Sequence, residues 1–339
     1  MVVSENPHVV HTGLNGGRPA TPNAPSSALE PPLSSLQIPA KPSHSPSATS
    51  VSSIDSRYES PLPAEGLSPI VGLGWFLMAC VVGYVVIWPF SDVPLRSMLM
   101  LDSPWFFAWY VGLVQLQAAV FLVSRMAIRA LGAKYKDEQK ADGWILTTAS
   151  GVVLTVCGVY VIPVTLAEGD LLGAGFRAVV ASNPTALQVV CVLFVAALHT
   201  DCVLGTLFYP RTIDVLSGWV HHGVYTVIML YALASKQVWI FMLFGIDEIP
   251  TVMLGIGNIH VPWRFDWSFG IAFWLTRVVW HTCVLGLLLY HRIWMADVRL
   301  SVTLVFVTLS LAMHCHWITN WASKKVKNHR NKKKEGKGE

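Results

Sequence analysis

The stretch PTALQVVCVLFVAALHTDCVLGTLF, residues 184–208, decides the fold class. It carries a single charged residue, Asp201, in a run long enough to cross about 30 Å of hydrocarbon as a helix. Pro184 suits the first helical position, where its missing N–H costs nothing. Pro210 lies just after the stretch and disfavours helix in the residue before it. We therefore predict a transmembrane helix here.

The same character extends over most of the chain, which has 339 residues, of which 53% are hydrophobic and only 13% charged. Ordinary soluble domains are about one-quarter charged, and one core could not bury this much apolar surface. A lipid solvent removes that difficulty, because the outside of the protein may also be apolar. We predict an all-α, polytopic transmembrane helix bundle of about eight spans. The expected spans lie near 69–90, 104–124, 143–166, 184–208, 219–235, 237–258, 268–291 and 299–322.

Charge placement predicts the topology, because Lys and Arg near spans accumulate on the cytoplasmic side. Five basic residues lie in the 125–142 segment, and eight more follow Ala322. These segments share a side only if an even number of crossings separates them, and the six spans expected between them give an even number. If 237–258 were only a loop, the two segments would face opposite sides. Both termini are then cytoplasmic.

Residues 1–66 differ from the rest of the chain, because they hold 11 of the 20 prolines and one aromatic residue, Tyr58. Such a segment cannot bury enough apolar surface to offset the cost of ordering, so we predict a disordered Ser/Pro-rich cytoplasmic tail. Two spans and a basic loop are expected at 67–136, followed by a six-span domain at 137–322. A basic cytoplasmic tail is expected at 323–339, either as a positive-inside anchor or as a site for anionic lipid head groups.

The sequence gives little reason to expect a metal ion or a cofactor. The six cysteines lie singly in apolar stretches, which argues against a disulfide or zinc framework. His314 and His316, two residues apart, point to nearly opposite sides of a helix. Haem held between neighbouring spans, for instance by His199 and His281, stays open as a minor alternative. No nucleotide-binding or serine-hydrolase motif occurs in a suitable context, and the charge pattern does not indicate nucleic acid.

Polar side chains inside the spans carry the strongest functional signal, because a charge at the centre of a span costs about 2.5–3.5 kcal/mol. In the predicted topology Asp201, Glu248 and Arg277 lie roughly 12–15 Å deep, at 1.5 Å per helical residue. Glu248 and Arg277 are expected to pair. These groups either tie helices together or line a polar, lipid-accessible cavity. The expected cavity residues are His199, Asp201, Asp247, Glu248, Arg277 and His281, with His221 and His222 as candidate catalytic residues.

From the fourth span onward, the order of these motifs resembles the TLC domain family, which includes the ceramide synthases. Asp201 lies in one span, the His221-His222 pair opens the next, and Asp247-Glu248-Ile249-Pro250 follows about two dozen residues later. The resemblance covers residues 137–322 and implies a six-span core. The acidic segment matches only part of the synthases' longer signature, which indicates a member unlike the synthases.

The resemblance implies an integral membrane protein of the endoplasmic reticulum that handles or adjusts membrane lipids. One alternative is a ceramide-synthase-type acyltransferase, in which the histidine pair acts in acyl transfer from acyl-CoA. A transporter that uses the buried polar groups is a third possibility. The expected partners are membrane lipids, with acyl-CoA added for the acyltransferase, and the residues leave open whether the protein is an enzyme.

Overall fold

The computed structural model describes residues 67–91, 93–168, 170–294 and 300–335. Over these residues the regular structure is helical, without strands, which confirms the all-α prediction. Six helices are long and apolar enough to cross a membrane, as expected for an integral membrane protein. The predicted disordered tail, 1–66, lies outside the described residues.

The six long helices match six of the predicted spans, but most of them extend further. Glu138, Gln139 and Lys140 continue one helix beyond its apolar stretch, because polar residues of this kind form helix well. Asp137 caps that helix by accepting a hydrogen bond from the backbone N–H of Lys140 at 3.0 Å. The six are α1 with the turn after it (Pro69–Phe90), α3 (Pro104–Ala130), α4 (Glu138–Ala167), α6 (Thr185–Phe208), α10 to α11 (Asp266–Trp294) and α12 (Leu300–Glu335, with its apolar part at Leu300–Lys327).

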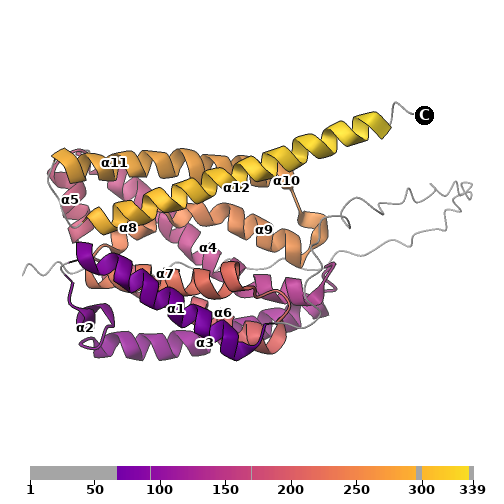
Figure 1. Cartoon of the computed structure of the whole chain (residues 1–339), viewed down its shortest axis with the longest axis horizontal. Coiled ribbons are helices and arrows are strands. Elements are labelled where there is room, and N and C mark those ends of the chain that lie inside the picture. Colours follow the sequence, from indigo (N-terminus) through magenta and orange to yellow (C-terminus); the bar gives the residue numbers. More distant parts are fainter. Residues whose placement is uncertain (1–66, 92, 169, 295–299, 336–339) are drawn as a thin grey trace, which may run out of the picture. The chain divides into compact units, whose positions relative to one another are not determined.

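Two further helical runs correspond to the predicted spans 219–235 and 237–258. The first is a π-helical segment, Val215–Val220, that leads into α7, His221–Ala234. The second is broken into α8 (Val238–Leu243), the 3₁₀ turn η3 (Gly245–Glu248) and α9 (Ile249–Ile259). Both runs lie alongside the long helices (Figure 1). Two short helices, α2 (Leu95–Met98) and α5 (Ala174–Ala181), belong to connections.

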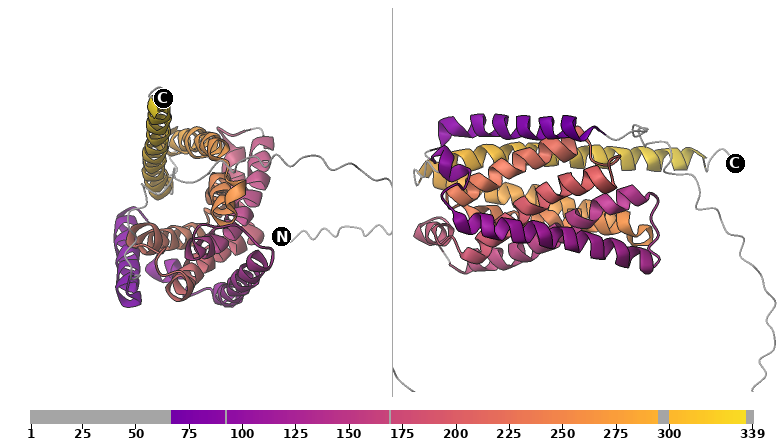
Figure 2. Two further views of the ribbon diagram at one scale, coloured as in Figure 1. Left: turned by 90° about the vertical axis from the view of Figure 1, so that its right-hand side faces the viewer. Right: turned by 90° about the horizontal axis from the view of Figure 1, so that it is seen from below.

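The helix α6 lies at the centre of the packing. Of its most apolar window, 56% is buried, against 22% for α1 and for α3. It contacts α3, α4 and α7, while α11 packs against α12. Seen end-on, α11 and α12 lie together on one side and α1 and α3 lie on the other (Figure 2). The outer faces of α1 and α3 carry exposed large apolar side chains, which suits contact with lipid.

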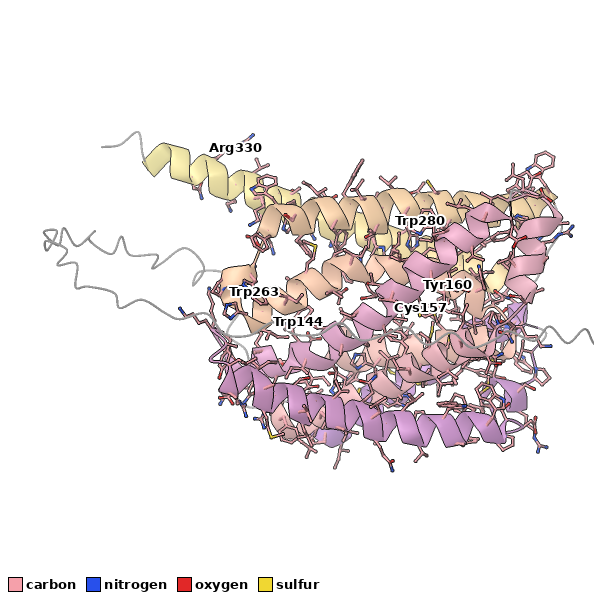
Figure 3. The ribbon with its side chains drawn as sticks, turned by 180° about the vertical axis from the view of Figure 1, so that it is seen from behind. Trp144, Cys157, Tyr160, Trp263, Trp280 and Arg330 are labelled. Atoms are coloured by element: carbon pink, nitrogen blue, oxygen red, sulfur yellow. The ribbon has the colours of Figure 1, made fainter. Side chains whose placement is uncertain are left out.

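The connections fall into two groups at opposite ends of the helices. At one end, the backbone N–H of Val261 donates to the carbonyl of Lys134 at 2.7 Å, and that of Arg211 donates to Gln139 at 3.2 Å. Trp144 and Trp263 lie toward this end, and α12 continues past the other helices there (Figure 3). At the other end, His291 donates to the carbonyl of Leu171 at 2.7 Å. The segment before α10 is therefore bonded to the loop between α3 and α4, and the end of α11 is bonded to the segment before α5.

Candidate functional site

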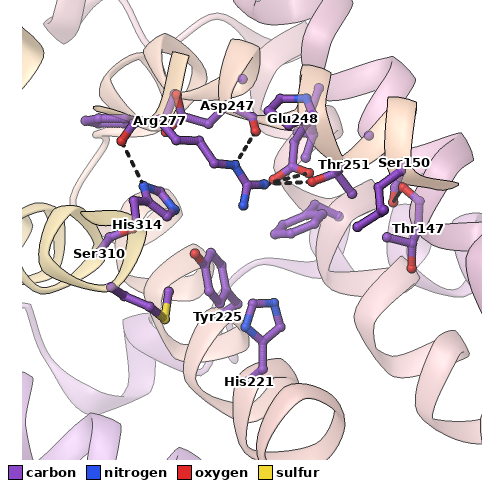
Figure 4. A pocket seen from close by; sticks show the side chains of 18 of the residues that line it. Thr147, Ser150, His221, Tyr225, Asp247, Glu248, Thr251, Arg277, Ser310 and His314 are labelled. Carbon is purple, nitrogen blue, oxygen red and sulfur yellow. Dashed lines mark hydrogen bonds and ion pairs between the residues drawn. The ribbon is translucent and has the colours of Figure 1, made fainter. Parts of the chain in front are cut away.

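A cavity of about 500 Å³ lies between α4, α6, α7, η3, α9, α11 and α12. This volume falls in the usual range for small-molecule sites, about 300–1,000 Å³. The close-up shows polar side chains from several helices turned toward one space (Figure 4). Its ionisable lining residues are Asp201, His221, His222, Tyr225, Asp247, Glu248, Arg277, His281 and His314.

Arg277 is the centre of the polar network on one side of this cavity. Its Nε donates to the backbone carbonyl of Asp247 at 2.6 Å, and its Nη2 donates to Thr251 Oγ1 at 2.7 Å. Its Nη2 also lies 3.7 Å from Glu248 Oε2, so the expected Glu248–Arg277 ion pair is present. These contacts fasten the η3–α9 run to the π-helical segment Trp274–Trp280 (Figure 4).

A close approach of two backbones places Asp247 and Glu248 at the cavity. A Cβ added at Gly245 would lie 2.3 Å from the carbonyl oxygen of Leu154 and 3.0 Å from the nitrogen of Gly158. Only glycine at position 245 lets η3 pack this tightly against α4. Pro250, in the first turn of α9, then restarts the helix beyond the turn.

The two adjacent histidines of α7 have different surroundings. The ring of His221 faces the cavity, and its centre lies 4.5 Å from that of Tyr225, one turn further along α7 (Figure 4). His222 is buried, and its Nδ1 lies 3.2 Å from Cys202 Sγ. Of the pair, His221 is therefore the side chain better placed to meet a bound molecule.

Asp201 and His222 lie side by side in the cavity lining. His222 Nε2 is 3.6 Å from Asp201 Oδ2, which is within ion-pair reach. The other carboxylate oxygen of Asp201 accepts a hydrogen bond from the Tyr209 hydroxyl at 2.5 Å. Asp201 is thus held from behind by Tyr209 and can orient His222.

Asp247, His281 and His314 form a buried group where η3, α11 and α12 meet. His281 Nδ1 lies 3.0 Å from Asp247 Oδ2, and its Nε2 donates to the carbonyl of Val307 at 3.0 Å. His314 Nδ1 donates to the carbonyl of Arg277 at 3.1 Å. The second carboxylate oxygen of Asp247, Oδ1, is buried and has no hydrogen-bond partner among the described residues.

His199 departs from the prediction, because it does not line the cavity. Its Nδ1 accepts from the Tyr110 hydroxyl at 2.6 Å, and its Nε2 donates to Thr226 Oγ1 at 3.1 Å. The Thr226 hydroxyl in turn donates a hydrogen bond to the backbone carbonyl of His222 at 2.8 Å. His199 therefore ties α6 to α3 and α7 outside the cavity.

Sequence reasoning missed several lining residues. Tyr225 could have been found, because it lies one turn after His221 on the same helix face. His314 was weighed only together with His316, and the structure separates them: His314 is buried at the cavity, whereas His316 is exposed and bonds to Asn320 at 2.8 Å. Nothing local in the sequence distinguishes the two.

Aromatic side chains form the apolar wall of the same cavity. Phe269, Phe273 and Trp321 line it from α10 and α12, and Trp321 packs edge-on against Phe269 with ring centres 6.3 Å apart. One turn beyond Trp321, Lys325 pairs with Asp266. The cavity thus combines a polar interior with an apolar wall and a charged rim.

Comparisons of the chain with protein-family models, with curated proteins and with solved structures gave no significant match.

Proposed function

We propose that this protein holds a membrane lipid in its intramembrane cavity and contributes to membrane lipid homeostasis, as its resemblance to the TLC family implies. The observation that carries the proposal is the cavity itself, in which half-buried polar groups such as His221 and Glu248 lie beside an aromatic wall. An amphiphile matches this division, because its head group can take the hydrogen bonds while its chain contacts the wall.

The proposed topology has eight spans and cytoplasmic termini. Two observations support it: α7 and the α8–η3–α9 run lie alongside the long helices, and the connections near Lys134, Arg211 and Lys325 gather at one end. That end carries the basic residues expected on the cytoplasmic side. Location in the endoplasmic reticulum rests on the family resemblance alone.

The lipid-handling proposal is tested by a quantitative lipidome of cells lacking the protein. We expect one lipid class to change and wild-type protein to restore it. The double variant His221→Ala/His222→Ala should fail to restore it, because it removes polar groups of the cavity lining. His316→Ala, an exposed histidine on α12, is the matched control and should behave as wild type.

A measurement of bound lipid tests the same proposal independently. The full chain, purified in mild detergent, should retain a defined lipid class in native mass spectrometry, and the double histidine variant should lose it. Retention of the same lipids by both proteins, with no lipidome change in cells, would overturn a role for the cavity in lipid handling.

A second candidate, acyl transfer from acyl-CoA to an amine-bearing lipid, is favoured by the Asp201–His222 arrangement beside His221. A neutral histidine would accept the proton of the attacking amine while the C–N bond forms and the thioester C–S bond breaks, and the thiolate would leave with a proton. The test is product formation from a mass-labelled acyl-CoA and a sphingoid base. Product that depends on the histidine pair supports the enzyme; lipid binding without product supports lipid handling alone.

A further inference from the structure

Asp247, His281 and His314 come from three separate elements, and one potential ligand atom from each lies within 4.8 Å of the others. All three side chains are buried, with exposed fractions of 6%, 2% and 5%. They also line the cavity. This group is used neither by the proposed lipid binding nor by the acyl-transfer alternative.

The hydrogen bonds of the two histidines determine which nitrogens carry protons. His281 Nε2 donates to the carbonyl of Val307, so in the neutral ring the lone pair is on Nδ1. His314 Nδ1 donates to the carbonyl of Arg277, so its lone pair is on Nε2. Metal-binding histidines have this arrangement, in which one ring nitrogen donates to a backbone carbonyl or a carboxylate and the other is the ligand.

The Asp247–His281 contact then poses a chemical problem. The Nδ1 lone pair of His281 lies 3.0 Å from the carboxylate oxygen Oδ2 of Asp247, and two acceptors at this distance repel each other. A cation between them, either a proton or a metal ion, converts the repulsion into attraction. Oδ1 of Asp247 also lacks a hydrogen-bond partner in the described part of the chain, although the residue is more than nine-tenths buried.

We propose that Asp247, His281 and His314 bind a divalent transition-metal ion of the Zn²⁺ class. Two imidazoles and one carboxylate are the protein ligands of many sites that keep a position open for water or another molecule. Ligands around a tetrahedral zinc ion are about 3.3 Å apart at bond lengths near 2.0–2.1 Å, so binding draws the three groups closer together. The fourth ligand comes from the cavity.

The guanidinium group of Arg277 is compatible with this assignment. Its Nε and Nη2 are directed at the Asp247 carbonyl and at Thr251, and the charge is paired with Glu248. Its carbonyl, not its side chain, contacts His314. Arg277 therefore orients one ligand through its carbonyl, while its guanidinium group is bonded to the Asp247 carbonyl and to Thr251 and is paired with Glu248.

The first experiment measures metal directly on the full chain, purified through a tag without histidine. Elemental analysis of protein as isolated, and of chelator-treated protein reloaded with Zn²⁺, should give about one ion per chain. Co²⁺ in place of Zn²⁺ should give visible absorption bands typical of nitrogen and oxygen ligands. The tail histidines are identical in all variants and cancel from the comparison.

Substitutions at two of the three proposed ligands test whether these side chains bind the ion. His314→Gln should weaken Zn²⁺ binding by more than the roughly 10–100-fold loss typical of an outer-shell partner. Asp247→Asn should also lose the ion but should fold well, because the new amide N–H can donate to His281 Nδ1. His316→Gln, two residues from His314 and exposed, should bind as tightly as wild type.

The outcomes separate the metal proposal from the lipid proposal. Equal Zn²⁺ affinity in wild type, Asp247→Asn and His314→Gln would overturn the metal site and leave a proton shared between Asp247 and His281. Lipid retention, measured on the same preparations, reports on the cavity independently. Metal without lipid, or lipid without metal, would therefore identify which of the two proposals fails.

Discussion

Two histidine clusters between the helices of this protein differ in how they use their hydrogen-bonding groups. Around His199, Tyr110 donates to Nδ1, Nε2 donates to Thr226, and Thr226 donates onward, so each group has a matched partner. Around His281, Nε2 donates to the Val307 carbonyl, so Nδ1 needs a proton or a metal ion to face Asp247 Oδ2, and the other oxygen of that carboxylate has no described partner. The first cluster is part-buried and the second is buried, yet both lie between packed helices, so position in the bundle alone does not indicate function. The buried oxygen without a described partner, Asp247 Oδ1, distinguishes the second cluster.

The largest loss of stability is expected when Arg277 is replaced, because this residue contacts both Asp247 and His314 of the second cluster. Arg277→Met removes the hydrogen bonds to the Asp247 carbonyl and to Thr251 and leaves Glu248 without its partner. Removing one member of a buried pair costs about 3–5 kcal/mol. Because the side chains of Arg277 and Glu248 are 13% and 27% exposed, the low end of that range is expected. Thermal unfolding in detergent should show this loss. Arg96→Gln, in an exposed pair with Asp102, should cost less than about 1 kcal/mol.

A smaller loss is expected when the turn that carries Asp247 is pushed away from α4. Gly245→Ala places a methyl group 2.3 Å from the Leu154 carbonyl oxygen, which must move. Overpacking of this kind costs about 1–3 kcal/mol. Gly286→Ala, on α11 with open space at the added methyl group, should be neutral or stabilising by up to about 1 kcal/mol. Equal melting temperatures for the two variants would contradict the close packing of η3.

Removing one hydrogen bond from the His199 cluster should lower the free energy of unfolding without affecting the cavity. Tyr110→Phe removes the donor to His199 Nδ1, a loss of about 1–3 kcal/mol when the acceptor stays buried and unpaired. Because His199 lies outside the cavity, lipid retention and Zn²⁺ binding should stay at the wild-type level once the protein is folded. A loss of lipid in Tyr110→Phe, measured below its melting temperature, would show that the two clusters are coupled.

Much of the fold could be predicted from the sequence, because apolar length is a strong signal in a membrane. The long helices were placed within a few residues at most ends, and α3, α4 and α12 extend further because polar residues also form helix. The break near Asp247 and Pro250 was visible as charges and a proline inside an apolar run. The π-helical segments have no comparable signature and were not predicted.

The candidate site could be predicted only in part, because sequence gives depth along a helix better than direction around it. His199 and Asp201 lie two residues apart, roughly 200° around an α-helix, so they could not both face one cavity. That geometry excludes one of the two, and only the structure shows that it is His199. His314 could not have been chosen over His316 without the position of α11, since the two have similar local sequence.

The smallest effect is expected at the charged rim of the cavity. Lys325 and Asp266 form an ion pair there whose side chains are 33% and 39% exposed. Pairs this exposed contribute about 0.2–1 kcal/mol, because water screens them and two long side chains must be held in place. Lys325→Gln should therefore shift the melting temperature only slightly, and the shift should shrink at high salt, since the screening length falls to about 3 Å at 1 M.

The loss in Arg277→Met should persist at that salt concentration, because its ion pair is largely buried. If both losses vanished together, the Glu248–Arg277 pair would have to be as accessible to solvent as the rim, and the polar interior of the cavity would be open to bulk water.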